Sequence, residues 1–103
     1  MIRIEKWNAG QDGPLTEAAM QDSLENRGFL VSRFVYPPGT YFPDHTHDSD
    51  KIDGVLSGRF RVTVLGESVI LEAGDSVAIP GGTVHSAEVI GDQSVVSLDA
   101  TLG

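Results

Sequence analysis

Short apolar runs separated by glycine, proline and aspartate make up most of this chain. Residues 59–64 alternate polar with apolar side chains, so Phe60, Val62 and Val64 are expected to share the buried face of a strand. Similar runs predict strands over residues 29–36, 51–56, 69–71, 77–79, 84–90 and 95–98. Short strands joined by tight turns at this spacing are typical of an all-β sandwich or barrel.

One segment near the N-terminus predicts a helix. Thr16 fits the N-cap position, Glu17 suits the positive end of the helix dipole, and Gly28 fits the residue just after the last turn. Met20 and Leu24 lie one turn apart and would share a face. We expect this helix to pack on the rest of the domain and to carry no chemistry.

Length and composition indicate one ordinary globular domain. With 103 residues and no linker or repeat, the chain is predicted to be a single domain over residues 1–103, with a strand and helix within 1–28 and a barrel over 29–103. The net charge of −8 disfavours nucleic acid and anionic membranes as partners. The absence of cysteine excludes disulfides and thiolate metal sites. The N-terminal residues lack the apolar run of a signal peptide, so a cytoplasmic location is expected.

The histidines of the sequence are concentrated in two short segments. His45 and His47 lie in one of them, and His85 lies well downstream in the other. On a strand, residues i and i+2 point to the same face, so His45 and His47 would reach one ion from one strand. A closed β-structure would bring His85 across to them. Because imidazole is the commonest metal ligand in proteins, this clustering predicts a metal site.

The residues around these histidines carry a family resemblance. The first segment has a glycine, a His-x-His pair and a later glycine, and the second has a glycine, Pro-x-Gly and a histidine. The matching positions are Gly39, His45, His47 and Gly58, followed by Gly74, Pro80, Gly82 and His85. In this pattern the chain resembles the cupin superfamily.

The resemblance implies a small antiparallel jelly-roll β-barrel with a divalent metal ion inside, held by His45, His47 and His85. Iron, manganese, nickel and zinc are the metals such barrels commonly hold. The superfamily includes dioxygenases and isomerases as well as non-catalytic binding modules, and the fold alone does not choose among them. Small cupins often form dimers, so a homodimer is expected, and the alternating segment 2–5 is a candidate for that contact.

The sequence departs from the family pattern at two positions. Val89 stands where the second motif ends in asparagine, and Lys51 stands where the first motif has its glutamate ligand. An ammonium group cannot ligate a cation and would repel it. Three interpretations follow: a site of three histidines only, a site in which Asp53 replaces the glutamate, or a metal-free barrel in which Lys51 supplies the positive charge.

Lys51 and Asp53 are also the candidates for catalytic roles. They lie two residues apart on one predicted strand and would face the same way. A buried aspartate needs a partner, for which Lys51, His45 or a metal ion are available. Lys51 or Asp53 would then transfer protons in an enzyme. The alternative is an exposed charged pair at the mouth of the barrel.

Two classes of function remain after these observations. The first is a metal-dependent enzyme, an oxygenase or an isomerase, acting on a small molecule. The second is a non-catalytic module that binds a metal or a small molecule, including a metal-free form with Lys51 in place of the glutamate.

Overall fold

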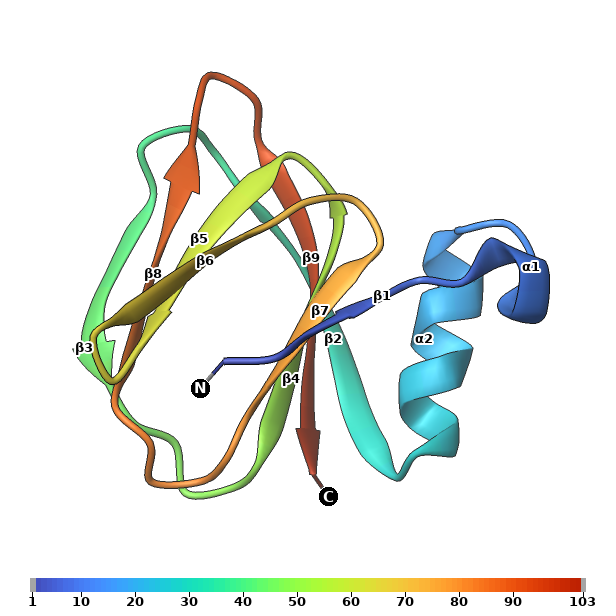
Figure 1. Ribbon diagram of the computed structural model, residues 1–103, viewed down its shortest axis with the longest axis horizontal. Helices are drawn as coiled ribbons and strands as arrows, with labels where there is room; N and C mark the ends of the chain where they lie inside the picture. Colours follow the sequence, from blue (N-terminus) through green and yellow to red (C-terminus); the bar gives the residue numbers. More distant parts are fainter. Residues whose placement is uncertain (1, 103) are drawn as a thin grey trace.

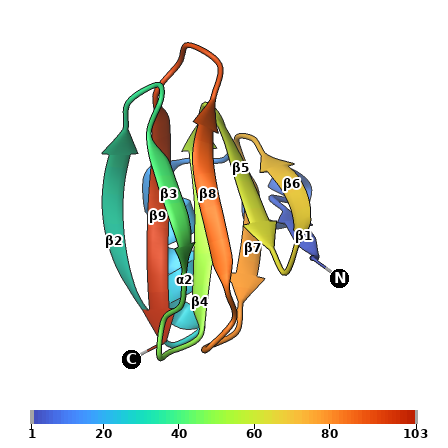
Figure 2. The same ribbon diagram turned by 90° about the vertical axis from the view of Figure 1, so that its left-hand side faces the viewer.

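The computed structural model describes residues 2–102 and consists of two antiparallel sheets that face each other (Figures 1 and 2). One sheet has the strand order β1-β7-β4-β9-β2, and the other has the order β3-β8-β5-β6. The strands are β1 (Ile4–Lys6), β2 (Phe29–Tyr36), β3 (Tyr41–His45), β4 (Lys51–Ser57), β5 (Arg59–Val64), β6 (Glu67–Leu71), β7 (Asp75–Ile79), β8 (His85–Ile90) and β9 (Val95–Leu102). The predicted all-β architecture of antiparallel strands is therefore confirmed.

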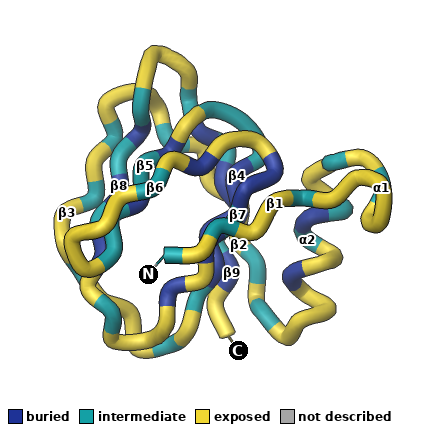
Figure 3. The backbone as a smooth tube through the Cα atoms, in the orientation of Figure 1, coloured by how far each residue is buried: buried dark blue, intermediate teal, exposed yellow. Residues whose placement is uncertain are grey.

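The three central strands of the five-stranded sheet contain most of its buried residues, as the dark segments of β4, β7 and β9 in Figure 3 indicate. Its inner face contributes Val55, Val77 and Val95 to the core between the sheets, with Phe60 and Val62 opposite. Its outer face packs against the N-terminal helix and forms a second core there. This second core consists of Met20, Leu24, Ile52, Leu98 and Ala100. Alternate residues of β4 thus serve two different cores.

The predicted helix is α2 (Glu17–Asn26), and its ends follow the expected chemistry. Thr16 Oγ1 accepts a hydrogen bond from the backbone amide of Ala19 at 3.0 Å, as an N-cap does. Gly28 takes a positive φ of 93° just after the helix. A single extra turn, α1 (Ala9–Asp12), was not expected; the Asn8 side chain caps it by accepting from the amide of Gln11.

The N-terminal strand belongs to the barrel. β1 pairs with β7 of the same chain, and Ile2 and Ile4 pack against the inner core. Among residues 2–102, no helix has the length and apolar character needed to cross a membrane.

The turn at Gly58 joins β4 to β5 and tolerates no side chain. Gly58 has a φ of 82°, and a Cβ there would meet the backbone of Ser94 and come within 3.0 Å of Val95 Cα. Gly66 has nearly the same φ, 83°, with nothing within 4 Å of its Cβ position. The two glycines therefore share a backbone conformation and differ in the space around them.

Replacing each glycine by alanine separates these two effects. We expect Gly66→Ala to lower the free energy of unfolding by about 1–2 kcal/mol, the cost of a left-handed conformation for a residue with a Cβ. Gly58→Ala should lower it by a further 1–3 kcal/mol or so, because fixed backbone atoms occupy the space. Urea denaturation of both variants measures the difference, and equal losses would contradict this account of the Gly58 turn.

Candidate metal centre

A bulge in β3 turns His45 toward the inside of the barrel. Phe42 pairs with Ala87 and His45 pairs with His85, so three steps along β3 match two steps along β8. Strict alternation from Phe42 would send His45 to the outer face, and the extra residue reverses this. Pro43 lies within the bulge, where a residue without an N–H is tolerated.

His47 is placed by two loops that dock on each other. It follows the end of β3, so His45 and His47 do not share one strand as predicted, because regular pairing stops at His45. The amide of Gly82 donates to the His47 carbonyl at 2.8 Å, and the amide of Gly81 donates to Asp50 Oδ1 at 2.8 Å. The turn of the second motif thus fixes the loop of the first.

The three imidazoles meet in one group. The ring centroids of His45 and His85 are 4.2 Å apart, those of His45 and His47 are 4.9 Å apart, and those of His47 and His85 are 5.1 Å apart. One ring nitrogen from each residue lies within 4.8 Å of the others, so together they could hold a metal ion. Asp53 is not a member of this group. His85 is buried, whereas His47 is exposed to solvent.

Local hydrogen bonds orient two of the rings. His45 Nδ1 lies 2.7 Å from the carbonyl oxygen of Pro43, and His85 Nδ1 lies 2.9 Å from that of Thr83. A carbonyl oxygen only accepts, so each Nδ1 is the donor. In the neutral rings Nε2 is then the atom with the free lone pair, which is the arrangement found at metal-binding histidines.

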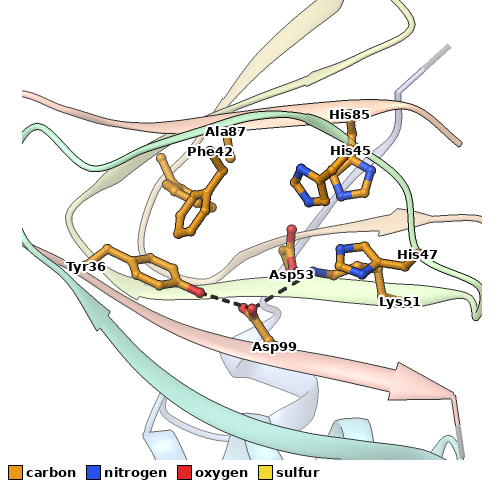
Figure 4. Close-up of a pocket in the computed structure, with 10 residues that line it drawn as sticks. Tyr36, Phe42, His45, His47, Lys51, Asp53, His85, Ala87 and Asp99 are labelled. Carbon is orange, nitrogen blue, oxygen red and sulfur yellow. Dashed lines mark hydrogen bonds and ion pairs between the residues drawn. The ribbon is translucent and has the colours of Figure 1, made fainter.

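A charged cluster forms the opposite wall of the site, on β4 and β9 (Figure 4). Lys51 Nζ lies 2.9 Å from Asp53 Oδ1 and 3.9 Å from Asp99 Oδ2. Asp53 and Asp99 face each other across the two strands. The short Lys51–Asp53 contact is a buried ion pair, and Lys51 is the group of the described residues that faces Asp53 Oδ1.

Asp99 is held by two hydroxyl groups. Tyr36 Oη donates to its Oδ2 at 3.1 Å, and Ser97 Oγ donates to its Oδ1 at 2.9 Å. Burial and the neighbouring carboxylate of Asp99 raise the pKa of Tyr36 well above its usual range. Tyr36 therefore remains a hydrogen-bond donor throughout the physiological pH range.

These residues enclose a cavity of about 150 Å³ between the two sheets. Its polar lining comes from the histidines, Lys51, Asp53, Asp99 and Tyr36, and its apolar end comes from Phe42, Phe60 and Ala87. The rings of Phe42 and Phe60 pack edge to face at 6.4 Å. Figure 4 shows His45 and His85 on the side of this space opposite Asp53 and Asp99, and His47 beside Lys51.

The electrostatics of the site favour neutral histidine and disfavour a free carboxylate. The pKa of His47 is lowered by partial burial of its ring and by the positive charge of Lys51. The pKa of Asp53 is raised by burial, an effect that Lys51 opposes and Asp99 reinforces. A neutral His47 has the lone pair that a metal ion requires.

The structure answers one of the alternatives left by the sequence. Lys51 and Asp53 do not form an exposed pair at the barrel mouth, because their side chains are only 11% and 6% exposed. Strand pairing with β7 and β9 on either side of β4 encloses them. Lys51 is the partner of Asp53, while the catalytic roles predicted for both residues stay predictions.

Asp99 and Tyr36 were not predicted as part of the site. Asp99 lies between buried residues on β9. A charged residue within a largely apolar strand was the sequence signal that could have identified it. Tyr36 offered no such signal, since an aromatic residue at a strand end is usually part of a core.

The comparison with known families assigns the fold. The profile of the cupin domain family matches residues 32–101, and the chain belongs to this family. Among solved structures, KdgF from a Halomonas species superposes with a TM-score of 0.65 at 26% identity, covering 74% of this chain and 70% of that one. An oxalate decarboxylase structure superposes with a TM-score of 0.63 at 26% identity, covering 73% of this chain and 22% of that one.

One curated relative is an enzyme of much greater length. Nitrosourea synthase of Streptomyces achromogenes subsp. streptozoticus is 33% identical over 69 residues, which is 66% of this chain. The match spans only 15% of the enzyme's length. The similarity therefore concerns only a small part of that enzyme.

The raised pKa of Asp53 makes a prediction about stability. The folded protein holds this proton at pH values where the unfolded chain, with a pKa of about 3.9, has lost it. The contribution of this proton to stability is therefore complete below the unfolded pKa and is lost as pH rises through the folded pKa. We expect the free energy of unfolding of the wild type, relative to Asp53→Asn, to fall as pH rises above the unfolded pKa of about 3.9. Urea denaturation in chelator tests this, and a difference that is constant or rises with pH would contradict it.

Proposed function

We propose that this cupin domain binds a divalent metal ion through His45, His47 and His85, and that the adjoining cavity takes a small molecule. Iron, manganese, nickel and zinc all accept imidazole ligands. The observation that carries the proposal is the orientation of His45 and His85, whose Nδ1 atoms are bound to backbone carbonyls so that Nε2 keeps its lone pair.

We propose that the metal supports chemistry on the small molecule. When bound, a divalent ion with three protein ligands acts as a Lewis acid or redox centre toward an oxygen-bearing substrate. On the opposite wall, Lys51 would donate hydrogen bonds to the substrate, and Asp53 would accept or release a proton. Two similar proteins, nitrosourea synthase and oxalate decarboxylase, have the names of enzymes. Their names support an enzymatic function for this domain, such as that of an oxygenase or an isomerase.

A second candidate function rests on the position of Lys51. Its ammonium lies in the same cavity as the three histidines, and its positive charge lowers the pKa of His47. In this alternative Lys51 takes the place of the ion, and the domain is a metal-free module that binds a small molecule without turnover.

A homodimer in the cytoplasm remains part of the proposal. β2 and β3 are edge strands of their sheets within residues 2–102, and Leu30 on β2 is 70% exposed. Exposed edge strands with apolar side chains are suited to pairing with a second copy. Segment 2–5, considered for that contact in the sequence, pairs with β7 on one side and packs against the inner core, and β1 is likewise an edge strand of its sheet within residues 2–102.

Metal content tests the primary proposal. Wild-type protein dialysed against zinc or cobalt should retain about one ion per chain, and His45→Ala and His85→Ala should each lose most of it, because two imidazoles form a weak site. Lys6→Met is the matched control, since it removes the Lys6–Asp75 ion pair outside the cavity. Elemental analysis measures the ratio, and unchanged metal content in the histidine variants would refute the ligand assignment.

Lys51→Gln distinguishes the two candidate functions. If the histidines hold a metal in the wild type, removing the ammonium relieves repulsion, and affinity should rise by about tenfold. If Lys51 takes the place of the ion, the wild type binds no metal and Lys51→Gln acquires binding. Competition with a fluorescent chelator measures both affinities, and Lys6→Gln serves as the control. A weaker affinity in Lys51→Gln would contradict the repulsion on which both outcomes depend.

A further inference from the structure

The charged wall of the cavity has unused hydrogen-bonding capacity. A lysine ammonium carries three donors. Lys51 is engaged by Asp53 at 2.9 Å, whereas Asp99 at 3.9 Å is beyond hydrogen-bond distance. Lys51 therefore has donors left for an acceptor in the cavity.

Asp53 offers the complementary group. Its Oδ1 is buried against Lys51 Nζ at 2.9 Å, and the residue also lines the cavity. Asp99 differs, because Tyr36 and Ser97 each donate to one of its oxygens. Asp53 is thus the carboxylate of the charged wall that has no hydroxyl partner among the described residues, and it lies beside the remaining donors of Lys51.

Charge and size restrict the ligand further. A divalent ion and Lys51 together carry three positive charges, of which Asp53 and Asp99 can neutralise at most two, so the site favours a ligand that carries a negative charge. The apolar end of the cavity, at Phe42, Phe60 and Ala87, requires a hydrocarbon group. A volume of about 150 Å³ is enough for a group the size of benzene, so the part of the ligand that lies within the cavity is small.

We propose, on the basis of the metal-binding function above, that the cavity binds a small α-hydroxycarboxylate with a short apolar substituent. The carboxylate accepts hydrogen bonds from Lys51, the hydroxyl donates to Asp53, and the substituent lies against Phe42 and Phe60. Recognition of the hydroxyl is then a property of Asp53, and recognition of the carboxylate is a property of Lys51.

Isothermal titration of the zinc-loaded wild type tests this with two matched acids, 2-hydroxy-3-methylbutanoate and 3-methylbutanoate, which lacks the hydroxyl. The hydroxy acid should bind at least about tenfold more tightly, equivalent to about 1.4 kcal/mol. Asp53→Val should reduce that preference below about threefold, Lys51→Met should weaken both acids to a similar extent, and Lys6→Met should change neither. Circular dichroism checks folding, and Asp53→Ala, which also lacks a side-chain acceptor, replaces Asp53→Val if the latter does not fold.

The possible outcomes distinguish a wrong ligand class from a wrong metal-binding function. If zinc is retained but the two acids bind equally, or neither binds, the ligand class is wrong and the metal site stands. If the preference survives in Asp53→Val, the hydroxyl is recognised elsewhere and the assignment to Asp53 is wrong. If the wild type retains no zinc, the metal-binding function and the ligand class fail together.

Discussion

The alternation of side chains along a strand is the constraint on which the site depends. A cavity between two sheets can be lined only by residues that point inward, and each strand offers every second position. β4 meets this condition directly, since Lys51, Asp53 and Val55 all face inward while Ile52 and Gly54 face the helix. β3 meets it only through the bulge between Phe42 and His45. Without that extra residue, His45 would point away from His85.

The two cores on either side of the five-stranded sheet explain why the charged wall is stable. Helix α2 covers the outer face through Met20 and Leu24, so water is excluded from that side of β4. The inward-facing charged groups therefore need partners within the cavity. Lys51 pairs with Asp53, and Asp99 accepts hydrogen bonds from Tyr36 and Ser97. Breaking a buried pair of this kind is more costly than the pair itself is stabilising.

Periodicity and turn chemistry were sufficient to predict much of the fold. Strands β2 and β5 occupy the predicted ranges 29–36 and 59–64, and Thr16 caps the predicted helix. The histidines were expected to converge, and they do so. These features depend on short segments of sequence, where side-chain pattern and backbone preference agree.

The remaining parts of the site depend on contacts between distant segments. The partnership of Asp53 with Asp99 follows from the register of β4 against β9, which no local pattern specifies. The placement of His47 follows from the docking of Gly81 and Gly82 on its loop. The bulge in β3 could not be predicted either. Pro43 indicates an irregularity in the strand, but it does not determine which face of the sheet the following residues point to.

The hydrogen bonds of His45 and His85 have a consequence for how such a site is inherited. Each ring is oriented by the carbonyl of the residue two positions before it, Pro43 in one case and Thr83 in the other. Each segment therefore carries both its ligand and the group that aims it, in three consecutive residues. Substitutions elsewhere in the barrel can reshape the cavity without disturbing this aim. A barrel built in this way can change the molecule that its cavity accepts while keeping the orientation of its histidines.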